Sequence, residues 1–211
     1  MRHISHEQIK SFERLYRANM INSCSGYKSA NIIGTLSAKG VENAAIFSSV
    51  IHMGSEPPVL GFVMRPATVP RNTYENIRTS RYYTINHVTE KMVNRAHQTS
   101  AKYPDNISEF EETGLTPLYR ADLPAPFVKE SPLQLAMKFM EEIPIKVNGT
   151  ILILGQILDI YCEEEMMHND GFIQLSKFNV ATINGLDGYA IPELKTRLSY
   201  ARPKQKLEEL K

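Results

Sequence analysis

The pattern of apolar and polar residues changes once along the chain, near Gly26. Before it, apolar residues recur at helical spacing from Ile9 to Tyr16, with Ser5 ahead of them as a helix cap, and predict a helix over residues 5–19. After Gly26, short segments either alternate apolar and polar residues or are apolar throughout, which is typical of strands. These predicted strands cover residues 31–37, 43–51, 59–64, 82–87 and 151–160.

Fewer segments have a helical pattern. We expect helices over residues 71–79 and 91–102, and an ordered loop region over residues 103–126, which carries several proline and aspartate residues. The segment 133–142 fits a helix or a strand equally well. Strands outnumber helices, so the sequence predicts a mainly β protein, a β-barrel with peripheral helices.

Three parts are expected along the chain. Residues 1–28 form an N-terminal helical extension, residues 29–203 form the β-domain, and residues 204–211 form a charged tail. Within the β-domain, the turn at Ala38-Lys39-Gly40 predicts that the first two strands form a hairpin.

Composition and charge indicate which partners are excluded and in which compartment the protein is expected. The 211 residues carry a formal net charge of +1, which gives no global field for nucleic acid or an anionic membrane. Cys24 and Cys162 are too few for a disulfide framework or a four-ligand metal site, so we expect free thiols in a reducing compartment. Residues 1–16 lack the apolar core of a secretory signal, and the apolar run 150–160 is too short to span a bilayer. We therefore predict a cytoplasmic protein with no nucleic-acid or membrane partner.

A basic segment is the first candidate for chemistry. The sequence has no glycine-rich dinucleotide fingerprint, no phosphate loop and no nucleophile elbow. Between residues 59 and 81, however, four arginines stand against one acid, Glu75, with threonine and asparagine donors between them: Arg65, Thr68, Arg71, Asn72, Thr73, Asn76, Arg78 and Arg81. Such donors near a helix start can hold a phosphate, and the alternative is a solvated basic face.

The predicted strand over residues 43–51 is the second candidate. Its alternation places Asn43, Ala45 and Ser49 on one side, and Ala44 and Ser48 on the other. Small residues beside an amide and hydroxyls allow a flat ligand to approach the backbone. The alternative is a half-buried strand with serines on its surface.

Histidine supplies the third candidate. Ala96, His97 and Ser100 fall on one side of the predicted helix 91–102, where His97 could donate to an anionic ligand or serve as a structural hydrogen-bonding group. His87 and His168 have no recognisable ligand spacing, so we expect no metal site.

A series of short motifs runs along most of the chain. They are Asn43-Ala44-Ala45-Ile46-Phe47-Ser48, Pro57-Pro58, Met64-Arg65-Pro66, Arg71-Asn72-Thr73-Tyr74-Glu75-Asn76-Ile77, Ile85-Asn86, Ala96-His97-Gln98-Thr99-Ser100-Ala101, Ser108-Glu109-Phe110, Gly114-Leu115-Thr116-Pro117, Glu130-Ser131-Pro132, Asp170-Gly171 and Tyr200-Ala201-Arg202-Pro203. In their order and spacing, these motifs resemble the flavin reductase-like family of FMN-binding split β-barrel proteins, over roughly residues 29 to 203.

The resemblance implies a homodimer with FMN at the subunit interface. It implies three groups of cofactor-binding residues: ring and ribityl contacts from Asn43, Ala44, Ala45, Ser48 and Ser49; phosphate contacts from Arg65, Arg71, Asn72 and Thr73; and a flavin edge closed by Ala96, His97 and Ser100. It further implies hydride transfer from NAD(P)H to the flavin and an electron-accepting partner, with no catalytic side chain, because the flavin carries the redox chemistry.

Alternatives remain at this point. The chain could be a non-enzymatic FMN-binding electron carrier, or a β-barrel whose basic segment binds another phosphorylated ligand. The chain also departs from the family, since Ala136-Met137 stands where members often carry Glu-Cys, and Gln174 where they carry Asp. These departures leave the predicted fold unchanged. They bear on which electron donor and acceptor the protein uses and on the subfamily to which it belongs.

Overall fold

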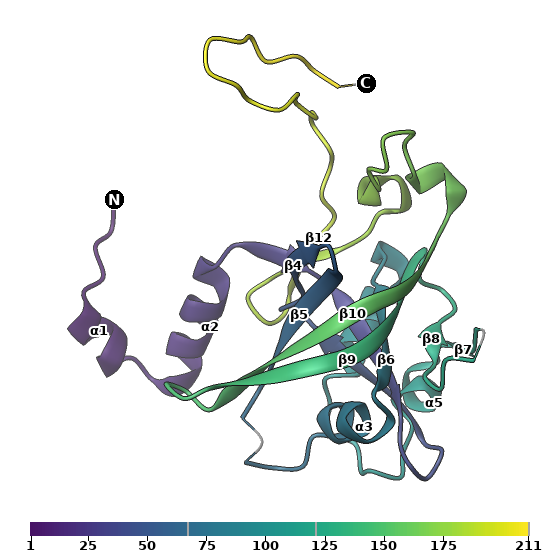
Figure 1. The fold of residues 1–211 in the computed structure, drawn as a ribbon. Helices are drawn as coiled ribbons and strands as arrows, with labels where there is room; N and C mark the ends of the chain where they lie inside the picture. Colours follow the sequence, from purple (N-terminus) through teal and green to yellow (C-terminus); the bar gives the residue numbers. More distant parts are fainter. Residues whose placement is uncertain (67, 121, 211) are drawn as a thin grey trace.

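A seven-stranded antiparallel sheet organises the computed structural model, which describes residues 1–66, 68–120 and 122–210 (Figure 1). The strands follow one another across the sheet in the order β3 (Glu42–Phe47), β2 (Asn31–Leu36), β6 (Tyr82–His87), β9 (Leu133–Ile145), β10 (Thr150–Cys162), β5 (Pro58–Met64) and β4 (Ile51–Ser55). The two edge strands, β3 and β4, are consecutive in the chain, so the sheet curls until its edges approach. This mainly β architecture confirms the predicted fold class.

Smaller elements surround the sheet. They are β1 (Tyr27–Ser29), β11 (Thr182–Asn184) and β12 (Gly188–Ala190), which pair as one sheet; β7 (Pro117–Leu118) and β8 (Phe127–Val128), which pair as another; the helices α3 (Asn72–Ser80), α4 (Val93–Gln98) and α5 (Glu109–Thr113); and the 3₁₀ helices η1 (Glu90–Met92), η2 (Glu164–Met166) and η3 (Leu175–Phe178).

Strand alternation divides the apolar residues between two cores. One lies inside the curled sheet, where Ile33, Phe62, Tyr83 and Met137 are fully buried. The other lies on the opposite side of β2 and β3, where α4, α5 and β11 cover their outward-facing side chains. Because successive side chains on a strand point to opposite faces, each strand between the cores contributes to both.

A serine ties the β3–β4 connection to β5. Val63 lies beyond the part of β5 that pairs with β4, so its backbone would otherwise be unpaired on that side. Ser49 Oγ donates to the Val63 carbonyl at 3.3 Å and accepts from the Val63 N–H at 3.1 Å. This single side chain replaces a strand partner where the barrel is split.

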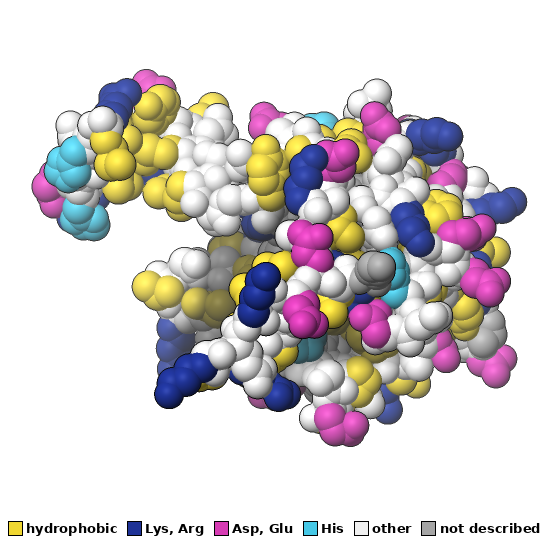
Figure 2. All heavy atoms as spheres, turned by 90° about the horizontal axis from the view of Figure 1, so that it is seen from above, with side chains coloured by type: hydrophobic (Ala, Val, Ile, Leu, Met, Phe, Trp, Pro, Cys, Tyr) yellow, Lys and Arg dark blue, Asp and Glu magenta, His cyan; other side chains and the backbone are white. Residues whose placement is uncertain are grey.

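The N-terminal extension consists of two helices instead of one. α1 (His6–Ser11) ends at Phe12, which has extended backbone angles, and α2 (Arg14–Cys24) runs beyond the predicted end at residue 19. Neither helix has a buried residue, and Figure 1 shows both at the side of the barrel. From above, they form a lobe that projects from the main body (Figure 2). The C-terminal segment after β12 likewise extends away from the sheet.

Three other segments differ from their sequence-based predictions, and in a fourth the structure decides between two alternatives. The strand predicted over residues 43–51 ends at Phe47, and residues 48–50 connect it to β4. The helix predicted over residues 91–102 ends at Gln98, and the predicted loop 103–126 contains α5 and β7. The segment 133–142 is a strand because it pairs with β6 on one side and β10 on the other.

Gly155 is required by close packing inside the barrel. A β-carbon at this position would collide with the hydroxyl of Tyr83, which is fully buried and forms no hydrogen bond within the described residues. We expect Gly155→Ala to lower the free energy of unfolding by about 1–3 kcal/mol, since an added methyl group in a close-packed core forces neighbours to shift. Urea unfolding measures the change.

Two variants make this prediction specific. Adding Tyr83→Phe should restore part of the loss, because it removes the hydroxyl oxygen, which is the nearest of the Tyr83 atoms that the β-carbon would meet. Gly54→Ala is the control, since its β-carbon would meet only ordinary contact, 3.6 Å from the Pro57 oxygen. Equal losses in the single and double variants would contradict the proposed collision.

Candidate functional site

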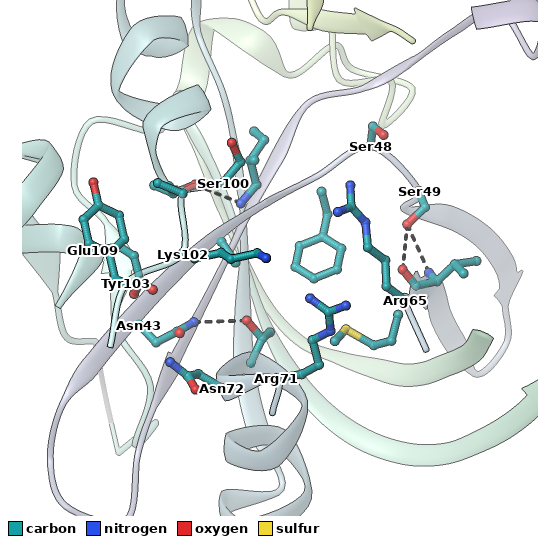
Figure 3. Close-up of a pocket in the computed structure, with 18 of the residues that line it drawn as sticks. Asn43, Ser48, Ser49, Arg65, Arg71, Asn72, Ser100, Lys102, Tyr103 and Glu109 are labelled. Atoms are coloured by element: carbon teal, nitrogen blue, oxygen red, sulfur yellow. Dashed lines mark hydrogen bonds between the residues drawn. The ribbon is translucent and has the colours of Figure 1, made fainter. Parts of the chain in front are cut away.

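A cavity of about 460 Å³ opens where the sheet is split. Its walls come from the end of β3, the β3–β4 connection, the segment between β5 and α3, the loop after α4, and the turn between β11 and β12. Figure 3 shows the polar and charged side chains of these segments around one opening. Segments far apart in the sequence therefore meet at this site.

Side chains complete the free edge of β3 at the cavity wall. The Ala44 N–H donates to Glu109 Oε2 at 3.1 Å, and the Ile46 N–H donates to Thr99 Oγ1 at 3.0 Å. Asn43 adds a side-chain bond to Thr73 Oγ1 at 3.1 Å. Edge strands normally present unpaired backbone groups, and here Glu109 at the start of α5 and Thr99 just after α4 satisfy two of them. The strand is thereby fixed against the cavity without a further strand beside it.

One corner of the cavity suits an anion. Arg71 is the N-cap residue of the nine-residue helix α3, and its Nε atom is buried without a hydrogen-bond partner in the described part of the chain. Asn72 and Thr73 follow it at the helix start, where free N–H groups and the helix dipole favour negative charge. A buried guanidinium N–H without a partner is costly unless a ligand supplies the acceptor. This corner therefore fits a phosphate group.

The charge of the lining is predominantly positive. Arg65, Arg71 and Lys102 all line the cavity, and none forms an ion pair with a carboxylate within residues 1–66, 68–120 and 122–210. Among the described residues, the one acid in the lining is Glu109, which is 6% exposed. Burial raises the pKa of its carboxyl group, and the backbone N–H groups that it accepts from oppose this rise.

Nine of the twelve residues proposed from the sequence line this cavity. They are Asn43, Ala45, Ser48, Ser49, Arg65, Arg71, Asn72, Thr73 and Ser100.

The other three are not among the lining residues. Ala44 and Ala96 are fully buried in the outer core. His97 is exposed, and its Nδ1 lies 3.1 Å from the hydroxyl of Tyr189 on β12. In this chain His97 therefore contacts a neighbouring strand.

Several lining residues were missed by sequence reasoning. Lys102 and Tyr103 follow α4, Glu109 begins α5, and Ile183 and Leu186 come from β11 and the turn after it. Glu109 belongs to the motif Ser108-Glu109-Phe110, to which the resemblance assigns no cofactor contact. The basic and aromatic pair Lys102-Tyr103, two residues beyond Ser100, was the signal available for the loop.

Within the described residues no group of three histidine, cysteine or acidic side chains could hold a metal ion. No helix in the described ranges is long and apolar enough to cross a membrane.

Comparison with known proteins assigns the family. The flavin reductase like domain model matches residues 27–176, and the chain belongs to this family. A crystal structure from Shewanella frigidimarina NCIMB 400, of a split-barrel protein provisionally assigned as a flavin reductase, is 47% identical, with a TM-score of 0.92. The similarity covers 95% of this chain and 100% of that one. Flavin-related oxidoreductase function is the assignment that this membership supports.

Two more distant structures share the fold. Nitrilotriacetate monooxygenase component B from Bacillus cereus is 19% identical with a TM-score of 0.82, over 94% of this chain and 98% of that one. Flavoredoxin of Desulfovibrio vulgaris (Miyazaki F) is 22% identical with a TM-score of 0.71, over 85% and 93%. Their names cover different roles on one architecture, so the fold alone does not select the redox partner.

Because the pKa of Glu109 is raised, we can predict how the stability of the folded protein depends on pH. A carboxyl group whose pKa is higher in the folded state stabilises the protein most when protonated, and this contribution is lost as the pH rises through the folded-state pKa. Glutamine does not titrate. The Glu109→Gln variant should therefore gain stability relative to the wild type as the pH rises from about 4, near the usual glutamate pKa, to neutrality.

Urea unfolding at a series of pH values measures this difference. Glu112→Gln, an exposed position on the same helix, is the control and should show little dependence on pH. A stability difference between Glu109→Gln and wild type that stays constant with pH would contradict the effect of burial.

Proposed function

We propose that this chain binds FMN in the cavity and is an NAD(P)H-dependent oxidoreductase of the flavin reductase type. The observation that carries the proposal is the buried, unpartnered Nε of Arg71 beside the start of α3, inside a cavity of about 460 Å³. Family membership supports a flavin as the ligand, and the phosphate corner favours its phosphorylated mononucleotide form.

The proposed phosphate contacts are Arg71, Asn72 and Thr73. The resemblance also gave Arg65 a phosphate contact, but this residue is exposed and we do not assign it to the buried corner. The arginine provides a charged, directional donor, and the helix start adds N–H groups and a favourable dipole. Thr73 already accepts from the side chain of Asn43, which leaves its hydroxyl hydrogen free to point at an anion. This arrangement is expected to distinguish FMN from riboflavin, which lacks the phosphate.

The ring and ribityl chain are assigned to the wall along β3. Ala45 presents only a methyl group there, so a flat ligand can approach the backbone. Ser48 and Ser100 offer hydroxyl groups to the same cavity, whereas the Ser49 hydroxyl is already bonded to Val63. We therefore expect Ser49 to shape the wall more than to bind the ligand.

No side chain is proposed as a catalytic acid or base. Bound FMN would supply the redox chemistry by accepting a hydride from a dihydronicotinamide. The residues of this chain would bind and orient the two ligands and limit the access of water. We also propose that the protein is a cytoplasmic homodimer that passes electrons to an acceptor or partner protein. Exposed apolar residues on β4, β9 and β10, including Met53, Met140 and Ile160, support a subunit contact.

Anaerobic spectroscopy tests the proposed activity. Purified protein reconstituted with FMN should show the absorbance of oxidised flavin, and addition of NADH or NADPH should bleach it within seconds to minutes. Bleaching by dithionite but by neither nicotinamide would identify an electron carrier. Protein that retains no flavin would favour a different phosphorylated ligand.

Substitution of Arg71 tests the phosphate corner. We expect Arg71→Ala to weaken FMN binding by about tenfold or more, because a charged hydrogen bond to the phosphate is lost. Riboflavin affinity should change by less than about threefold, because riboflavin has no phosphate to lose a charged contact. Flavin fluorescence titration measures both constants. Arg78→Ala is the control, since this arginine pairs with Glu142 and does not line the cavity. Equal losses for FMN and riboflavin would argue against this placement.

A further inference from the structure

The cavity carries more positive charge than one flavin phosphate needs. In the part of the chain that the structure describes, three cationic residues and one buried acid line it. A phosphate monoester has a charge of about −1.5 to −2 at neutral pH. Arg71 and the start of α3, which acts like about half a positive charge, come close to neutralising it at one corner. Arg65 and Lys102 are then left without an anion.

These two cations flank the same stretch of backbone. Lys102 follows Thr99, whose hydroxyl accepts from the Ile46 N–H. Arg65 follows Val63, whose backbone is bonded to Ser49. Residues 47 and 48 lie between these two anchor points. Figure 3 shows Arg65 and Lys102 projecting toward the opening from different segments.

Exposure separates this pair from the phosphate corner. Arg65 and Lys102 are both exposed, whereas the Nε atom of Arg71 is buried. A buried cation suits a resident cofactor, since its contacts are strengthened by the lower dielectric. Exposed cations contribute modestly and are screened by salt, which suits a ligand that must leave in each turnover. They also attract an anionic substrate toward the opening.

We propose that Arg65 and Lys102 form a second anion site, which holds the pyrophosphate of the nicotinamide dinucleotide. The inference rests on the proposed FMN site. The sequence has no glycine-rich fingerprint that could hold a pyrophosphate with backbone N–H groups, so side chains must provide the donors. Two cations from separate segments match two linked phosphates.

Binding of ADP-ribose, which contains the pyrophosphate but cannot transfer a hydride, tests the site without turnover. Calorimetric titration into FMN-loaded protein should give a dissociation constant raised about fivefold or more by Arg65→Gln or Lys102→Gln, and further by the double variant. FMN affinity should stay within about twofold, because the buried corner at Arg71 is intact. The matched controls Arg78→Gln and Lys91→Gln, both outside the cavity, should behave as wild type.

A pair of hydride donors gives an independent measurement. With NADH, kcat/KM should fall in the double variant about as much as ADP-ribose affinity falls. With reduced nicotinamide riboside, which has no phosphate, kcat/KM should be nearly unchanged.

Two outcomes would overturn the inference alone. They are an unchanged ADP-ribose affinity in the FMN-loaded double variant, and a parallel loss of FMN affinity, which would return both cations to the flavin phosphate. Wild-type protein that binds no FMN would overturn the proposed function and this inference together.

Discussion

The free edge of β3 is the constraint on which the cavity depends. A strand at the edge of a sheet has backbone groups that need partners, and a further strand would fill the space that the cavity occupies. Glu109 and Thr99 solve this problem with side-chain acceptors for the Ala44 and Ile46 N–H groups. Ser49 does the same for Val63 on the other side of the split. The barrel can therefore remain open while these N–H groups of β3 and the backbone of Val63 have hydrogen-bond partners.

Much of the fold follows from periodicity. The strand predicted over residues 82–87 has those bounds in the structure, because Tyr83 and Ile85 face one core while polar partners occupy the other side. Periodicity predicted the end of an element less accurately where a tertiary contact determines that end. At the end of α4, four residues before the predicted end, the Thr99 hydroxyl donates to the Ala96 carbonyl and accepts from the Ile46 N–H.

Part of the candidate site was predictable because some of its residues are adjacent in the sequence. Asn72 and Thr73 are adjacent to Arg71 at a helix start, so local sequence was enough to group them. Ala44 and Ala45 were grouped by motif, but consecutive strand residues face opposite sides, and only Ala45 lines the cavity. Lys102 and Glu109 enter through loop geometry that no local pattern specifies. Contacts across long sequence separations are decided by tertiary packing.

The division of the cavity into a buried and an exposed cationic part bears on how one small site could serve two anionic ligands. If all the cations lay together, a resident phosphate would neutralise some and repel a second anion from the rest. In the proposed arrangement burial reduces this conflict, because the Nε atom of Arg71 is buried at the start of α3 while Arg65 and Lys102 are exposed. The side chains that hold β3 in place also anchor the segments that carry the two exposed cations. Thr99 bonds to β3 three residues before Lys102, and Ser49 bonds to β5, which ends just before Arg65. The contacts that satisfy the edge of β3 therefore also anchor the segments that carry Arg65 and Lys102.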